Sequence, residues 1–157
     1  MGFLYSMLYL LVISIACFIV GRLYPKKWVM ENKFPFSSFA FERNGAIYNK
    51  IGIARWKTKL PDMSMLLGDL FPSFIPKKRV DSSEKIPILI KETCIAEASH
   101  FVAGILGFGC SFIWRSSGGK ILSFLYFIGN LPFVIIQRYN RPRLKRTLEM
   151  LEKRKAA

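Results

Sequence analysis

Histidine and acidic residues are scarce in this chain of 157 residues. It has one histidine and ten Asp and Glu against 24 Lys and Arg, which gives a formal net charge of +14. The three cysteines stand apart with no CxxC or Cys/His ligand spacing, so neither a structural zinc site nor a disulfide framework is expected. No GxGxxG or GKS/T motif occurs, which argues against the common phosphate-binding loops. The sequence therefore predicts no bound metal ion and no bound cofactor.

Apolar residues, in contrast, are abundant and come in long blocks. They make up 52% of the chain, and aromatic residues make up 15%. A chain that is both this apolar and this basic is typical of a small membrane protein with one basic side. A nucleic-acid binder is the other interpretation of a basic chain, but apolar blocks argue against it and no nucleic-acid partner is expected. We expect one all-α integral membrane domain, residues 1–157.

Three apolar runs are long enough, or nearly long enough, to cross a bilayer, which takes about 20 residues. The first, residues 3–24, begins without a basic side chain and ends without a small-x-small cleavage site, so it is expected to be an uncleaved anchor. The other two runs must borrow neighbouring residues, which gives spans at about 94–115 and 120–139. The short loop "RSSGGK" between them predicts an antiparallel hairpin.

The distribution of basic residues predicts the orientation. Residues 22–91 carry fourteen Lys and Arg, residues 138–157 carry eight, and the hairpin loop carries two. By the positive-inside rule, the loop region 25–91 and the basic tail 140–157 are cytoplasmic, and the N-terminus is outside. The sequence thus predicts a multi-pass protein of a cell membrane.

The loop region 25–91 is expected to form short interfacial helices on the cytoplasmic leaflet. Its stretch "KFPFSSFAF" is rich in aromatic residues, which favour the membrane interface. Residues 65–75 have apolar side chains at helical spacing. A basic stretch further upstream carries an apolar stripe of Ile47, Tyr48, Ile51 and Trp56.

The single histidine lies in "ETCIAEASH", within the part that the second span needs to reach across the bilayer. On a helical wheel His100 falls between Glu92 and Glu97, and Glu97 and His100 are three residues apart. Ionisable groups in a span usually face a bundle interior or a wet cavity and mark a functional path. Pairing of the glutamates with basic residues at the membrane edge is the alternative.

The third span carries a second polar set in "NLPFVIIQRYNRPRL". With the hairpin loop centred near position 117.5, His100 and Arg138 lie at depths that agree within about 5 Å, at about 1.5 Å per residue. We therefore expect Gln137, Arg138 and Asn140 at the depth of His100, and Asn130 deeper. An anchor that only snorkels would need charge but not this mixture of amides and guanidinium groups.

Three blocks, "FERNGAIYNKIGIARWKTKLPD", "ETCIAEASH" and "NLPFVIIQRYNRPRL", resemble the glycosyl-4,4'-diaponeurosporenoate acyltransferase family in the same order. The resemblance covers about residues 39–150. It implies a small bacterial plasma-membrane enzyme of carotenoid biosynthesis that transfers a fatty acyl group to a primary sugar hydroxyl of a glycosylated lipid. Cys94 and residues 63–87 lie outside the family pattern.

The residues themselves indicate how such a transfer would work. His100 is the candidate general base, Glu97 would orient the imidazole, and Glu92 completes the candidate catalytic group. Donors to an oxyanion and contacts to the substrates are expected from the remaining polar residues. These substrate-binding candidates are Asn130, Gln137, Arg138, Asn140, Arg141, Arg43, Trp56 and Lys57.

The expected partners are the bilayer, a lipidic acceptor and an acyl donor that acts as co-substrate: acyl-CoA, acyl carrier protein or a lipid. Because three spans are few to enclose a site, a homo-oligomer is also a possible assembly. Two other functions stay open at this point. One is a non-catalytic lipid-binding or assembly subunit of a lipid or carotenoid biosynthesis complex. The other is a divalent metal held by Glu92, Glu97 and His100, which a single histidine makes a weak hypothesis.

Overall fold

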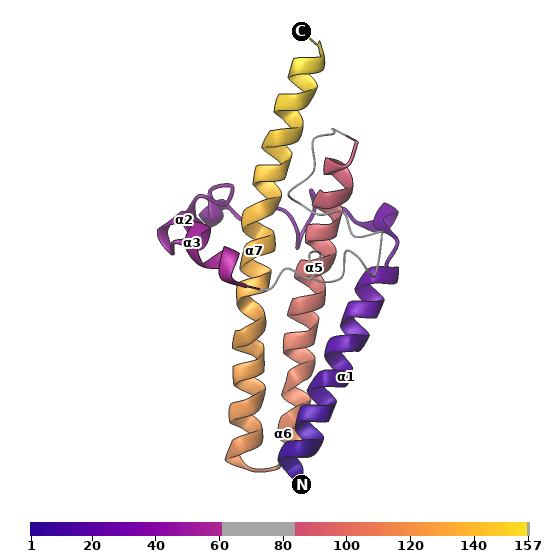
Figure 1. The fold of residues 1–157 in the computed structure, drawn as a ribbon, viewed down its shortest axis with the longest axis vertical. Helices are drawn as coiled ribbons and strands as arrows, with labels where there is room; N and C mark the ends of the chain where they lie inside the picture. The colour runs from indigo at the N-terminus through magenta and orange to yellow at the C-terminus, as the bar shows by residue number, and fades with distance from the viewer. Residues whose placement is uncertain (61–83, 157) are drawn as a thin grey trace. The chain divides into compact units, whose positions relative to one another are not determined.

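The computed structural model describes residues 1–60 and 84–156, and over these residues the chain is helical with no strand (Figure 1). The helix predicted at residues 65–75 lies outside the described residues. Among the described residues, three helices are long and apolar enough to cross a membrane. The predicted all-α membrane fold is therefore confirmed, whereas its orientation stays a prediction.

The first of these helices, α1, spans Gly2–Leu23 and matches the predicted span at residues 3–24. It forms because a run of apolar residues reaches Arg22 without a charge. Tyr24 leaves the helix with φ −62° and ψ 127°. That extended conformation is the one favoured before a proline, and Pro25 follows.

The second span is longer than the predicted 94–115. Helix α5 spans Ile86–Leu106, a 3-10 turn η5 spans Gly107–Gly109, and α6 spans Cys110–Ile113. The helix begins eight residues before the predicted start. Pro87 does not prevent this, because a proline in the first turn removes an N–H group that has no partner inside the helix.

The third span, α7, covers Ser117–Ala156 and extends far beyond the predicted end at residue 139. The tail is helical because Leu144, Leu148 and Leu151 recur at helical spacing among strong helix formers. At its other end α7 includes most of the predicted loop. Only three residues, Trp114–Ser116, separate it from α6.

The chain divides into two compact units, and the division falls within α5 and α7. Unit 1 comprises Met1–Lys27 and Ile95–Gln137, and unit 2 comprises Trp28–Cys94 and Arg138–Ala157. This division into compact units does not test whether residues 1–157 form one membrane domain, which stays a prediction.

Unit 1 is a bundle of α1, α6 and the adjoining parts of α5 and α7. Its core is formed by Leu10, Ile13 and Cys110. Gly107 allows a close approach to α7, because a Cβ there would lie 2.4 Å from the Tyr126 ring.

Unit 2 contains the predicted short helices of the loop region. They are η2 (Ala40–Glu42), α2 (Ile47–Lys50), α3 (Ile53–Trp56) and η3 (Lys57–Lys59), preceded by η1 (Lys26–Trp28) at the boundary of the units. The apolar stripe predicted for the membrane interface stays a prediction. Ile51 is 54% exposed, whereas Ile53 is fully buried, because Gly52 adopts a positive φ of 65° between two short helices and breaks the continuous helical spacing.

Candidate functional site

The imidazole of His100 is bound to the side chain of Asn130 in unit 1. Nδ1 of His100 lies 3.0 Å from Oδ1 of Asn130. The amide orientation is set at its other end, where Nδ2 of Asn130 donates to the carbonyl of Tyr126 at 2.9 Å. An amide oxygen can only accept, so Nδ1 of His100 carries the proton. Nε2 of the neutral imidazole is then the acceptor, the form that a general base needs.

The His100 ring is also held by an aromatic face. It stacks on Phe133 with the ring centroids 4.6 Å apart and the planes 11° from parallel. Asn130 and Phe133 are three residues apart, so one face of α7 provides both contacts. A ring that is fixed at Nδ1 and along one face presents Nε2 in a defined direction.

This pairing corrects the predicted register of the hairpin. His100 was expected at the depth of Arg138, with Asn130 deeper, but His100 contacts Asn130 and Phe133. The predicted loop was centred near 117.5, whereas α7 already begins at Ser117. The turn is centred on Arg115, and His100 and Asn130 each lie fifteen residues from it.

The two glutamates predicted beside His100 have different surroundings. Glu97 is 7% exposed in unit 1, and Glu92 is half-buried in unit 2. Within the described chain the hydrogen bond of the His100 ring goes to Asn130, so the orienting role of Glu97 stays a prediction. Over the same residues no group of three or more His, Cys, Asp and Glu side chains is placed to hold a metal ion.

An apolar groove of about 510 Å³ runs beside the His100–Asn130 pair within unit 1. Two of its lining residues, Asn130 and Phe133, are the ones that contact His100. The hydroxyl groups of Ser14 and Tyr126 in the groove wall are hydrogen-bonded. The Ser14 hydroxyl donates to the Leu10 carbonyl at 2.7 Å, and its oxygen lies 2.8 Å from the Tyr126 hydroxyl oxygen. The lining residues are Met7, Leu10, Ser14, Leu122, Leu125, Tyr126, Gly129, Asn130 and Phe133.

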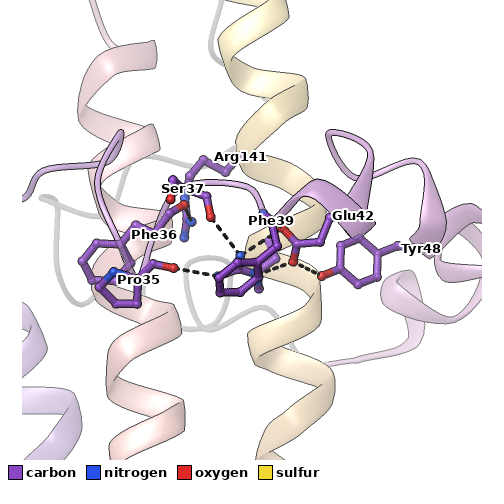
Figure 2. Close-up of polar contacts among 8 residues, drawn as sticks. Pro35, Phe36, Ser37, Phe39, Glu42, Tyr48 and Arg141 are labelled. Carbon is purple, nitrogen blue, oxygen red and sulfur yellow. Dashed lines mark hydrogen bonds and ion pairs between the residues drawn. The ribbon is translucent and has the colours of Figure 1, made fainter.

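A second polar cluster lies in unit 2 and is centred on Glu42 (Figure 2). Glu42 is 2% exposed and forms an ion pair with Arg138, whose Nε and Nη2 donate to its two carboxylate oxygens. Tyr48 O–H and the Phe39 N–H donate to the same carboxylate. The two oxygens therefore accept four hydrogen bonds, two of them from one guanidinium group.

The guanidinium groups of Arg138 and Arg141 bind the loop that precedes η2. Arg138 also donates to the carbonyls of Pro35 and Ser37, both at 3.0 Å. Arg141 is 3% exposed and donates to the Phe36 carbonyl at 2.5 Å. A planar guanidinium group is well suited to bind phosphate, but the Nε and Nη2 donors of Arg138 are already bound to the Glu42 carboxylate. This geometry favours a structural role for Arg138.

The pKa values in this cluster follow from the same contacts. Burial alone would raise the pKa of Glu42, but the hydrogen bonds from Arg138, Tyr48 and Phe39 and the charge of Arg138 outweigh it and hold the pKa below its ordinary value. The pKa of Tyr48 is raised, first by burial and then by its bond to the Glu42 carboxylate. Glu42 is therefore ionised and Tyr48 protonated at neutral pH.

The other predicted substrate-binding residues are spread over both units. Lys57 donates to Asn140 at 3.4 Å and lies 4.8 Å from the centre of the Tyr139 ring. Trp56 donates to the Ile51 carbonyl at 3.1 Å. Arg43 is exposed and Gln137 is buried. No substrate role of these residues is tested by the structure.

Sequence reasoning missed Glu42, Tyr126 and Thr93. Thr93 accepts a hydrogen bond from Nε of the buried Arg141 at 3.0 Å. A signal existed for Glu42, which is the only acidic residue between positions 32 and 61 of a strongly basic loop. Tyr126 and Thr93 gave no such signal, because one contributes a backbone carbonyl and the other a single hydroxyl.

Comparison with known proteins agrees with the predicted resemblance and extends it. The family model of glycosyl-4,4'-diaponeurosporenoate acyltransferase matches residues 25–150. Proteins of that name from Staphylococcus aureus strains bovine RF122 / ET3-1 and MRSA252 are 28% and 29% identical to this chain, over 94% of its length and 88% of theirs. No solved structure matches the chain. This helical membrane protein belongs to the glycosyl-4,4'-diaponeurosporenoate acyltransferase family and is an acyltransferase.

Proposed function

We propose that this enzyme transfers a fatty acyl group to a sugar hydroxyl of a glycosylated carotenoid or related isoprenoid lipid, with His100 as general base. Family membership supports the acyl transfer, and the names of the relatives point to the acceptor. The observation that carries the mechanism is the bond from Nδ1 of His100 to Oδ1 of Asn130, because it leaves Nε2 as the proton acceptor.

The reaction needs one proton to move twice. Nε2 of His100 takes the proton of the acceptor hydroxyl while the hydroxyl oxygen attacks the carbonyl carbon of the acyl donor. The tetrahedral intermediate then collapses, the bond between the acyl carbon and the leaving sulfur or oxygen breaks, and the imidazolium returns the proton to that atom. The new ester and the protonated leaving group balance the two substrates.

The neighbours of His100 have separate roles in this scheme. Asn130 holds Nδ1 and Phe133 holds the ring plane, so both position the base. The buried Glu97, one helical turn away, is the group proposed to assist the imidazole. The second N–H of the Asn130 amide is not needed by the Tyr126 carbonyl and is available to a developing oxyanion.

The proposed donor is an activated acyl thioester or ester that reaches the enzyme from the cytoplasm or from the cytoplasmic leaflet. The charge distribution supports this side, because residues 22–91 carry fourteen of the 24 basic residues. Acyl-CoA, acyl carrier protein and phospholipid all have an anionic portion that basic residues attract. Exposed Arg43 and Lys59 are the proposed contacts.

Substitution of His100 tests the mechanism in the purified full-length protein. His100→Ala is expected to lower kcat about 10²- to 10⁴-fold, the usual contribution of a general base. Asn130→Leu, which removes the acceptor for Nδ1, is expected to lower kcat about 10- to 150-fold, the equivalent of about 1.5–3 kcal/mol for a hydrogen bond to a charged group.

Ser111→Ala is the matched control, because this half-buried hydroxyl of the same hairpin bonds only Phe108 and Ser123 in the described chain. It is expected to retain wild-type kcat. Acyl transfer at the wild-type rate by His100→Ala would remove the proposed base while leaving the acyltransferase assignment in place.

A further inference from the structure

The groove of unit 1 is lined by residues of two helices, α1 and α7. Its α7 side runs from Leu122 to Phe133, with lining residues at helical spacing on one face. Its α1 side runs from Met7 to Ser14. The groove wall is apolar except near Ser14, Tyr126 and Asn130.

The length of the groove matches one layer of acyl chains. Phe133 follows Leu122 by eleven positions on α7, a rise of about 16 Å at about 1.5 Å per residue. The hydrocarbon core of a bilayer is about 30 Å thick and consists of two layers of acyl chains, so one layer is about 15 Å. A rigid isoprenoid that spans both leaflets would need about twice the length of this groove.

The polar end of the groove coincides with the proposed base. Asn130 lines the groove and binds His100, so a chain in the groove would bring its polar carbonyl end to the imidazole. The opposite end of the groove lies towards the hairpin turn. The start of α1 packs against that turn, because a Cβ at Gly2 would lie only 2.6 Å from the side chain of Trp114. Met7 and Leu122 lie nearer that end.

Gly129 keeps the groove open beside Asn130. A Cβ at Gly129 would meet no atom within 4 Å, whereas a Cβ at Gly107 would meet Tyr126 at 2.4 Å. Gly107 is thus needed for packing, but Gly129 is not. The missing side chain at Gly129 instead leaves space in the groove wall.

From these observations we infer that the groove binds the fatty acyl chain of the donor, with its carbonyl at the end formed by Asn130 and Phe133 and its methyl end towards Met7 and Leu122. The inference rests on the proposed function and names the chain that the site holds. The groove then sets donor selectivity. Burial of one methylene contributes about 0.8 kcal/mol to binding. Each methylene that no longer fits in the groove is therefore expected to lower kcat/KM roughly four-fold.

Two groove substitutions test this inference with a series of saturated acyl-CoA thioesters that differ by two methylene groups. Met7→Phe, at the far end, is expected to lower kcat/KM for the longest donors by roughly four-fold per excluded methylene, with the shortest donors unaffected. Gly129→Leu, beside Asn130, is expected to lower kcat/KM for all donors. Ile128→Phe adds bulk at an exposed neighbour that does not line the groove, and it is expected to behave as wild type.

A binding measurement separates failure of this inference from failure of the proposed base. A photoreactive fatty acyl-CoA carrying a diazirine near its methyl end is expected to label the peptides that contain Met7 and Leu122, in wild type and in His100→Ala alike. Gly129→Leu should remove this labelling. Equal labelling of the exposed Ile128 would indicate only surrounding lipid and would overturn the inference, as would an unchanged chain-length profile in Met7→Phe.

Discussion

The ion pair between Glu42 and Arg138 makes a sharp prediction about stability. Arg138→Met removes the guanidinium group and leaves a carboxylate that is 2% exposed with Tyr48 and Phe39 as its remaining donors. Breaking a buried pair in this way costs about 3–5 kcal/mol. Protonation of Glu42 limits the loss, because protonating a carboxyl with an ordinary pKa of about 4.3 at pH 7 costs about 3.7 kcal/mol. We expect a loss of about 3 kcal/mol at pH 7.

The pH dependence of this loss identifies its cause. In the wild type the pKa of Glu42 is lowered, so its contribution to stability is present above the unfolded-state pKa and is lost as the pH falls through the folded-state pKa. In Arg138→Met burial is opposed only by the hydrogen bonds from Tyr48 and Phe39, so the pKa of Glu42 is expected to rise from its wild-type folded-state value. The stability that the lowered pKa gives the wild type at neutral pH is then lost in the variant. The difference between the two proteins should therefore shrink from pH 7 to pH 4.5.

Urea unfolding of the purified protein in detergent micelles, followed by circular dichroism, measures the difference. Arg143→Met is the matched control, since Arg143 is exposed on the same helix and bonds the Tyr139 hydroxyl at 2.7 Å. It should cost less than about 1 kcal/mol. The double variant Glu42→Leu with Arg138→Met should recover much of the loss, because no buried charge is left unpaired. A loss in Arg138→Met equal to that in Arg143→Met, or one that is independent of pH, would refute the reasoning.

Three further predictions concern other contacts. Thr93→Val removes the acceptor of the buried Arg141 Nε and should cost about 1–3 kcal/mol in the same urea assay, an outcome refuted by wild-type stability. Gly119→Ala places a Cβ 2.0 Å from the Trp114 carbonyl oxygen and should cost about 1–3 kcal/mol or more, which a wild-type unfolding midpoint would contradict. Wild-type protein should lose stability on acidification through the pKa of Glu42, and Glu42→Gln should flatten that part of the pH profile.

The hydrophobic pattern of the sequence was enough to predict the number and nature of the spans. Apolar runs of this length have few alternatives, because only helices satisfy the backbone within a single segment in lipid. The ends of the spans were less predictable. Ser117 and the glycines after it favour a loop by composition, yet they form the first turn of α7. The turn therefore lies about two and a half residues earlier than predicted, and the prediction placed His100 beside Arg138 when its contacts are Asn130 and Phe133.

The partners of the polar residues were harder to predict than their positions. His100 was identified because it is the only histidine, and span arithmetic placed it in a helix. Its partner Asn130 follows from the position of a three-residue turn, which periodicity does not specify. The pairing of Glu42 with Arg138 joins residues 96 positions apart, and no local pattern in the sequence encodes such a contact.

The block "NLPFVIIQRYNRPRL" contains two kinds of residue, and kinetics should separate them. Asn130 and Phe133 hold the proposed base, whereas Arg138 and Arg141 bind a loop of unit 2. Loss of a positioning residue lowers kcat in protein that is fully folded. Loss of a structural arginine lowers the folded fraction, so kcat per folded molecule and KM should stay at their wild-type values. Arg138→Met with wild-type kinetics per folded molecule would establish the structural role, and a raised KM in folded protein would instead return Arg138 to the substrate-binding residues.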